Sequence, residues 1–82
     1  MRRYSIRCDG FDVSHLRGGF SFSAYEAGTK WAAEHLPGYE TCFAHYHRTY
    51  DSETEGLYAL WIMEAYCHEI GKGVQIYIRE ML

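Results

Sequence analysis

The chain has 82 residues and a mass of 9.6 kDa, which suffices for one hydrophobic core and not for two, so we expect a single domain over residues 1–82. Hydrophobic residues make up 48% and charged residues 23% of the chain, which excludes the composition of a disordered protein. The formal net charge of -3 argues against phosphate-backbone binding as the main source of affinity, so we expect no direct nucleic-acid partner.

Apolar stretches in the sequence are short. None reaches the roughly 20 consecutive apolar residues that span a bilayer. The first five residues lead directly into strand-like sequence, without the hydrophobic segment of a signal peptide. We therefore expect a cytoplasmic protein without a membrane partner.

The cysteines are odd in number and widely spaced. Cys8, Cys42 and Cys67 lack the Cys-x-x-Cys spacing of redox and zinc motifs. Our interpretation is three buried thiols that pack as small hydrophobic side chains. A disulfide pair, a metal ligand and a reactive thiol are the alternatives.

The first predicted element is a strand over residues 3–8. Polar and apolar residues alternate there, which places Tyr4, Ile6 and Cys8 on one face. Residues 9–19 contain turn residues and no sustained periodicity, so we expect a turn with a loop or short hairpin.

A helix is predicted over residues 24–36. Ser23 and Glu26 have the spacing of a capping box, in which the side chain of each accepts a hydrogen bond from the backbone amide of the other. Pro37 and Gly38 end the helix. The stripe predicted to face the core consists of Ala24, Ala27, Gly28, Trp31 and His35.

Three further strands follow the helix. Residues 40–50 and 57–66 have high strand propensity, and the polar, glycine-ending segment 51–56 predicts an antiparallel hairpin between them. Alternating apolar residues over 74–79 predict the last strand. The sequence therefore indicates an α+β fold in which a single helix packs on a three- to four-stranded antiparallel sheet, in the order β-α-β-β-β.

One helix covers only one face of such a sheet, while aromatic residues make up 17% of the chain and include eight tyrosines. A hairpin register that pairs Tyr50 with Leu57 leaves large side chains on both faces, whichever face the helix covers. Aromatic residues, arginine and methionine are enriched at the centres of protein interfaces. The alternative is a strand at 57–66 that is buried on both sides, with peripheral tyrosines. The predicted partner-binding residues are Tyr46, Arg48, Tyr50, Asp51, Glu53, Glu55, Tyr58 and Trp61.

Three carboxylates lie in the predicted hairpin loop, at Asp51, Glu53 and Glu55. A polar loop tip offers no burial that would tune a general acid and base. These residues form either a solvated turn or an acidic prong that fits a groove lined by Arg and Lys on a partner.

His45 and His47 form a His-x-His pattern, which on a regular strand places both imidazoles on one face about 7 Å apart. A third metal ligand would have to come from His68, Cys67, Glu64 or Glu69. The alternative is a pair of ordinary half-exposed histidines. No motif assigns a reaction, so we expect no enzyme, no catalytic residue, no metal and no cofactor.

The short first strand, the glycine-bearing loop, the helix that opens with residues 22–27 (FSAYEA) and the aromatic strands resemble small proteins carried by phages and mobile elements, of which anti-CRISPR proteins are the best-known group. The resemblance lies in chain size and element order. It implies a compact, non-catalytic inhibitor in the cytoplasm of an infected bacterium, which binds a Cas protein or surveillance complex.

Two other functions fit the residues. One is a metal-binding protein or hydrolase built on His45 and His47. The other is a structural homodimer in which the uncovered sheet faces of two copies pack together.

Overall fold

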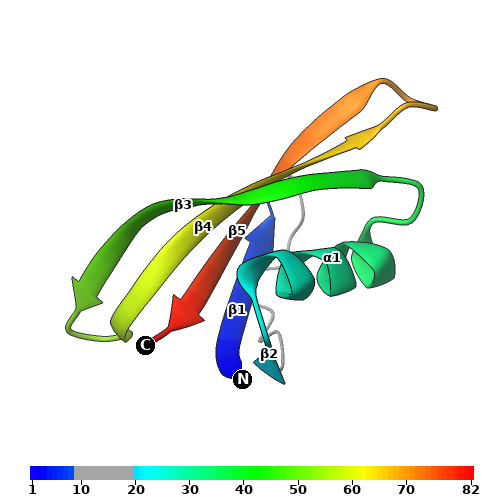
Figure 1. Ribbon diagram of the computed structural model, residues 1–82. Coiled ribbons are helices and arrows are strands. Elements are labelled where there is room, and N and C mark those ends of the chain that lie inside the picture. Colours follow the sequence, from blue (N-terminus) through cyan, green and yellow to red (C-terminus); the bar gives the residue numbers. More distant parts are fainter. Residues whose placement is uncertain (9–19) are drawn as a thin grey trace.

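The computed structural model describes residues 1–8 and 20–82 (Figure 1). These residues form one α-helix and a five-stranded antiparallel sheet, which confirms the predicted α+β class. Within them no helix is long and apolar enough to cross a membrane. The elements are β1 (Arg2–Cys8), β2 (Phe20–Ser21), α1 (Ala24–His35), β3 (Glu40–Ser52), β4 (Gly56–Cys67) and β5 (Lys72–Met81).

The prediction of three to four strands in the order β-α-β-β-β misses one element. The structure has a further strand before the helix, the two-residue strand β2. It pairs only with Arg2 and Arg3 at the start of β1. Two residues are too few for any alternation of polar and apolar positions, so the sequence carries no signal for this strand. The turn, loop or short hairpin expected over residues 9–19 lies outside the described residues.

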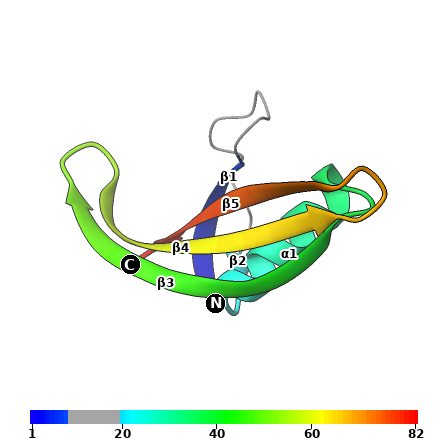
Figure 2. The ribbon, with the colours of Figure 1, turned by 90° about the horizontal axis from the view of Figure 1, so that it is seen from above.

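The strands follow the order β2-β1-β5-β4-β3 across the sheet, and each neighbouring pair is antiparallel. The last strand, β5, therefore lies between the first strand and β4. Figure 2 shows the sheet as a curved layer with α1 against one side. We call the side that carries α1 the helix face and the opposite side the open face.

The register predicted for the β3–β4 hairpin is wrong by one residue. Tyr50 lies opposite Tyr58 rather than Leu57, and the pairing continues to Ser52 opposite Gly56. The connection is therefore shorter than predicted, and Gly56 adopts a positive φ of 80° that favours glycine. Two register shifts also interrupt the pairing, one between Thr41 and Ala44 and one between Tyr46 and Arg48.

The helix begins as predicted. Ser23 Oγ accepts a hydrogen bond from the Glu26 amide at 3.1 Å. The Glu26 carboxylate accepts from the Phe22 amide at 3.4 Å, one residue earlier than in a standard capping box. It also pairs with Lys30 Nζ at 3.1 Å, four residues later on the helix.

The core lies between α1 and the helix face of the sheet. Tyr4 and Ile6 are each 1% exposed and Cys8 is 2% exposed, which confirms the buried face predicted for the first strand. The contact surface of the helix consists of the buried residues Ala24, Ala27, Gly28, Trp31 and Ala32, so His35, which was predicted to belong to this stripe, lies outside it and is exposed. Apart from Trp31, these residues are small and let the helix approach the sheet closely.

The closest approach is at Gly28. A Cβ atom added there would lie 2.7 Å from Ile78 Cδ1 and 2.8 Å from Met63 Sδ. Both neighbouring side chains are fully buried, so neither moves aside without displacing other core atoms. Gly28 thus sets the distance between the helix and the sheet.

Replacement Gly28→Ala is expected to lower the free energy of unfolding by about 1–2 kcal/mol, because the overlap with the core outweighs the higher helix propensity of alanine. Urea denaturation measures the change. Ile78→Val removes the Cδ1 atom that the new methyl group meets, so the double variant should lose less stability than the sum of the two single losses. A Gly28→Ala variant that is more stable than the wild type would contradict this packing.

Candidate binding surfaces

The structure divides the predicted partner-binding residues between the two faces of the β3–β4 hairpin. Residues directly opposite one another in an antiparallel pair share a face. Tyr46 lies opposite Trp61 on the helix face, whereas Arg48 lies opposite Leu60 and Tyr50 opposite Tyr58 on the open face. The register shift between Tyr46 and Arg48 causes the division, because an extra residue in one strand reverses the alternation that follows it.

On the open face, four side chains form a continuous row across three strands. The Arg48 guanidinium carbon lies 5.1 Å from the ring centroid of Tyr50. The rings of Tyr50 and Tyr58 are stacked, with centroids 5.2 Å apart and an interplanar angle of 21°. Arg79, on β5, places its guanidinium carbon 5.0 Å from the Tyr58 ring. These cation–π and stacking contacts favour the observed arrangement of the four side chains.

A pocket of about 360 Å³ opens beside this row. Tyr50, Tyr58 and Arg79 from the row contribute to its walls. We call it the open-face pocket. Its lining is completed by Leu60 on β4, Tyr77 on β5 and Arg7 on β1.

Four residues of the pocket lining were not predicted from the sequence: Arg7, Leu60, Tyr77 and Arg79. Arg7 and Tyr77 lie directly opposite one another in the β1–β5 pair. The two residues are 70 positions apart in the chain, and no local pattern shows that these strands are neighbours. The available signal was the alternation of side chains along a strand. Arg7 precedes the buried Cys8 and Tyr77 follows the buried Ile76, so both side chains point away from the core.

The helix face carries a groove of about 300 Å³ between the start of α1 and the middle of β3. Trp61, Tyr25 and Phe22 contribute aromatic side chains to it, and Glu80 contributes a carboxylate. Around it, Tyr46 contacts Trp61 edge to face with centroids 5.6 Å apart. The sequence predicted Tyr46 and Trp61 as surface residues but gave no reason to join them to the helix.

Glu80 is the polar centre of this groove, with a side chain that is 17% exposed. It accepts hydrogen bonds from Trp61 Nε1 at 3.0 Å and from the Tyr4 hydroxyl at 3.3 Å. Arg2 Nε lies 3.3 Å from the same carboxylate. Burial, followed by the charge of Glu80, raises the pKa of Tyr4 to about 12.

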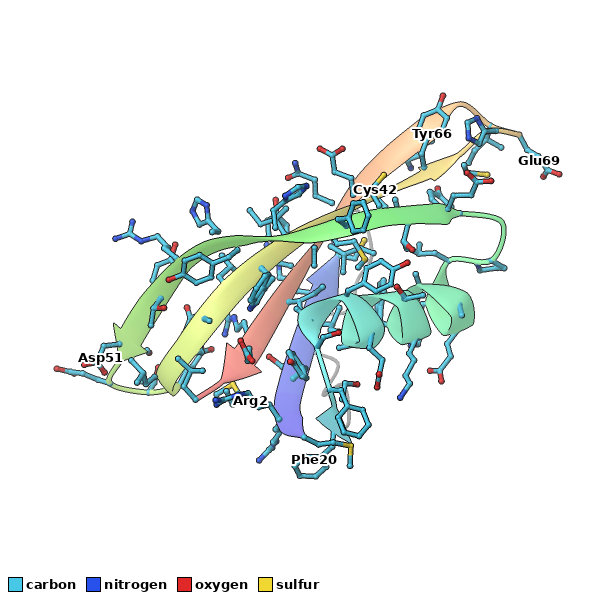
Figure 3. The ribbon with its side chains drawn as sticks, viewed as in Figure 1. Arg2, Phe20, Cys42, Asp51, Tyr66 and Glu69 are labelled. Carbon is cyan, nitrogen blue, oxygen red and sulfur yellow. The ribbon has the colours of Figure 1, made fainter. Side chains whose placement is uncertain are left out.

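The predicted acidic residues lie at the end of the β3–β4 hairpin, and Figure 3 shows Asp51 at one extremity of the molecule. Asp51 and Glu53 are exposed and form no ion pair within residues 1–8 and 20–82. Glu55 instead forms an ion pair with Arg79 on the open face. The exposed negative charge of the tip therefore comes from Asp51 and Glu53, while Glu55 connects the tip to the row.

The two histidines of the His-x-His pattern do not follow a regular strand. His45 lies opposite Ile62 on the open face, whereas His47 falls within the register shift between Tyr46 and Arg48. The spacing that predicted a shared face therefore does not apply. Across the described part of the chain, no group of three or more His, Cys, Asp or Glu side chains is arranged to hold a metal ion.

The expected burial of the cysteines is correct for Cys8 and Cys67 and wrong for Cys42, which is exposed. Cys42 lies on β3, the last strand in the sheet order, within the first register shift of the hairpin. It lines a shallow groove with Tyr66 and Val74 at the opposite end of the sheet from Asp51 (Figure 3).

Comparison of the chain with protein-family models, with curated proteins and with solved structures finds no match.

The raised pKa of Tyr4 predicts a loss of stability at alkaline pH. A tyrosine whose pKa is higher in the folded protein stabilises the fold below its ordinary pKa of 10, and this contribution is lost as the pH rises towards 12. At about 1.4 kcal/mol for each pKa unit, the contribution amounts to about 2–3 kcal/mol. Because burial, the largest cause, penalises the ionised side chain and does not strengthen the neutral one, Tyr4→Phe should be only slightly less stable than the wild type at neutral pH and should lack this part of the alkaline decline.

Urea unfolding of both proteins at a series of pH values between 9 and 12 measures the difference. Comparison with Tyr4→Phe removes the contribution of the other tyrosines and the lysines, which titrate in the same range. Parallel pH profiles for the two proteins would show that Tyr4 does not titrate differently on unfolding.

Proposed function

We propose that the protein is a small non-catalytic inhibitor that binds a bacterial defence complex, as anti-CRISPR proteins do, through the β3–β4 hairpin. The observation that carries the proposal is the composition of this hairpin. It combines two aromatic contacts, Tyr46 with Trp61 and Tyr50 with Tyr58, with exposed carboxylates at its tip. In Figure 1 the β3–β4 end extends past α1 and β2, and the end of β5 lies beside it.

The aromatic side chains supply the expected affinity. Tyrosine, tryptophan and arginine dominate the binding energy of protein interfaces because each buries a large area and retains a polar group. Tyr46 is 54% exposed on the helix face, and Arg48 is exposed on the open face. A partner that clasps the hairpin from both sides would bury both side chains.

The acidic tip is expected to steer the approach of a basic partner. Asp51 and Glu53 are exposed at the end of the hairpin. Charges at the rim of an interface increase the rate of association with an oppositely charged surface more than they increase the affinity. The surfaces of defence complexes that bind nucleic acid are basic, so an acidic tip with aromatic flanks is complementary to them.

The test uses tagged protein in lysates of bacteria that contain CRISPR complexes, followed by mass spectrometry and by a phage-interference assay. We expect stoichiometric retention of one defence complex and loss of interference. Tyr46→Ala and Tyr50→Ala should each weaken capture by about tenfold or more. Glu53→Ala should act mainly on the association rate and should lose its effect at high salt.

Glu34→Ala is the matched control, because it removes an exposed carboxylate from α1 rather than from the hairpin. The proposal fails if folded Tyr46→Ala, Tyr50→Ala and Glu53→Ala proteins capture the complex as well as the wild type does. Retention of no complex, together with self-association in sedimentation experiments, would favour the structural homodimer instead.

A further inference from the structure

We propose that the open-face pocket binds a ligand that combines an aromatic base with a phosphate group, namely a nucleotide that is free or part of a single strand. This site shares Tyr50 and Tyr58 with the hairpin that the proposed function uses. It depends on residues from β1 and β5 as well as from the hairpin.

The lining of the pocket offers both parts of such a ligand a partner. Tyr77 and the side chain of Leu60 provide apolar surface, and Tyr77 offers an aromatic ring. The faces of Tyr50 and Tyr58 are covered by one another and by Arg48 and Arg79, so these two rings line the pocket with their edges. Arg7 and Arg79 provide planar guanidinium groups, which bind phosphate oxygens through two parallel hydrogen bonds. A ring among the phenol side chains thus places its phosphate within reach of a guanidinium.

Charge favours an anionic occupant. Within the described residues Arg7 and Arg48 form no ion pair, and Arg79 is paired with Glu55. Among the described residues, the pocket and the adjoining row contain the guanidinium groups of Arg7, Arg48 and Arg79 and the paired carboxylate of Glu55. This local charge is positive, although the whole chain has a net charge of -3. Salt screens exposed charges beyond about 10 Å, so an anion in the pocket responds to this local excess more than to the distant acidic residues.

Size and shape favour a single ring over a peptide. The volume of about 360 Å³ is near the lower end of the range of small-ligand sites, about 300–1,000 Å³. A glutamate side chain satisfies a guanidinium but brings no flat surface to the tyrosines. A nucleotide engages both, because its base stacks on aromatic rings and its phosphate binds arginine.

The pocket is also preorganised. The row of Arg48, Tyr50, Tyr58 and Arg79 is held by contacts of 5.0–5.2 Å between successive groups. The Tyr77 hydroxyl donates a hydrogen bond to Gln75 at 2.9 Å. Side chains that are already ordered lose little entropy when a ligand binds.

Titration of the isotope-labelled protein, followed by NMR, tests the site with four probes: uridine monophosphate, uridine, inorganic phosphate and a short oligouridylate. We expect uridine monophosphate to shift the amide signals of Arg7, Leu60 and Tyr77. Uridine and inorganic phosphate should each bind at least about tenfold more weakly, because each lacks one of the two recognised parts. Tighter binding of oligouridylate than of the mononucleotide would identify a single strand as the source, and the reverse would identify a free nucleotide.

Two substitutions separate this site from the hairpin. Arg7→Gln should weaken binding of uridine monophosphate by about tenfold or more, as expected for loss of a charged hydrogen bond. Tyr77→Leu should weaken it by a similar factor while leaving an apolar side chain in place. Lys30→Gln removes the same charge from α1, and Tyr46→Ala removes an aromatic ring from the helix face, so both controls should bind as the wild type does.

The proposal is overturned if neither uridine monophosphate nor oligouridylate binds, or if Arg7→Gln and Lys30→Gln bind equally well. It is also overturned if a glutamate-rich peptide binds more tightly than oligouridylate, which would assign the pocket to a protein segment. Neither Arg7 nor Tyr77 belongs to the β3–β4 hairpin. Loss of nucleotide binding with intact capture of a defence complex, or the opposite, therefore shows which of the two proposals has failed.

Discussion

The contact between Gly28 and the side chains of Met63 and Ile78 determines how the rest of the molecule is arranged. It seats a 12-residue helix against β4 and the central strand β5, with no room for a methyl group at the point of closest approach. One helix of this length covers part of one face, so among residues 1–8 and 20–82 no helix covers the open face or the far end of the β3–β4 hairpin. The binding surfaces discussed above lie in these uncovered regions or at the margin of the helix.

The register shift between Tyr46 and Arg48 determines what those uncovered regions display. A regular strand would place Tyr46, Arg48 and Tyr50 on one face and form a single aromatic surface. The shift sends Tyr46 to the helix face beside Trp61 and leaves Arg48 and Tyr50 on the open face. The hairpin therefore presents aromatic side chains on both sides, which suits an arm that inserts into a partner better than a flat face that lies on one.

The sequence was sufficient for features that depend on neighbouring residues. The buried face of β1 followed from simple alternation, and the start of α1 followed from the spacing of Ser23 and Glu26. Features that depend on pairing between distant segments were not accessible. The strand β2 has two residues and no periodicity, and the open-face pocket required β1 and β5 to be neighbours. The register of the β3–β4 hairpin was also missed, because its turn is shorter than the polar segment 51–56. Of the residues that line the open-face pocket, the sequence therefore predicted Tyr50 and Tyr58 but not Arg7, Leu60, Tyr77 or Arg79.

The net charge, like the local sequence patterns, does not show which residues the fold brings together. A value of -3 for the whole chain argues against an anionic partner, yet the sum says nothing about where charges lie. The fold places Asp51 and Glu53 at the hairpin tip and gathers Arg7, Arg48 and Arg79 on the open face. The Glu55–Arg79 ion pair joins the two regions, so the charge of Glu55 is neutralised by an arginine of the row. The separation of charge arises from pairing among β1, β3, β4 and β5. One small sheet can therefore carry an acidic tip, which favours a basic surface, and a basic pocket, which favours an anion.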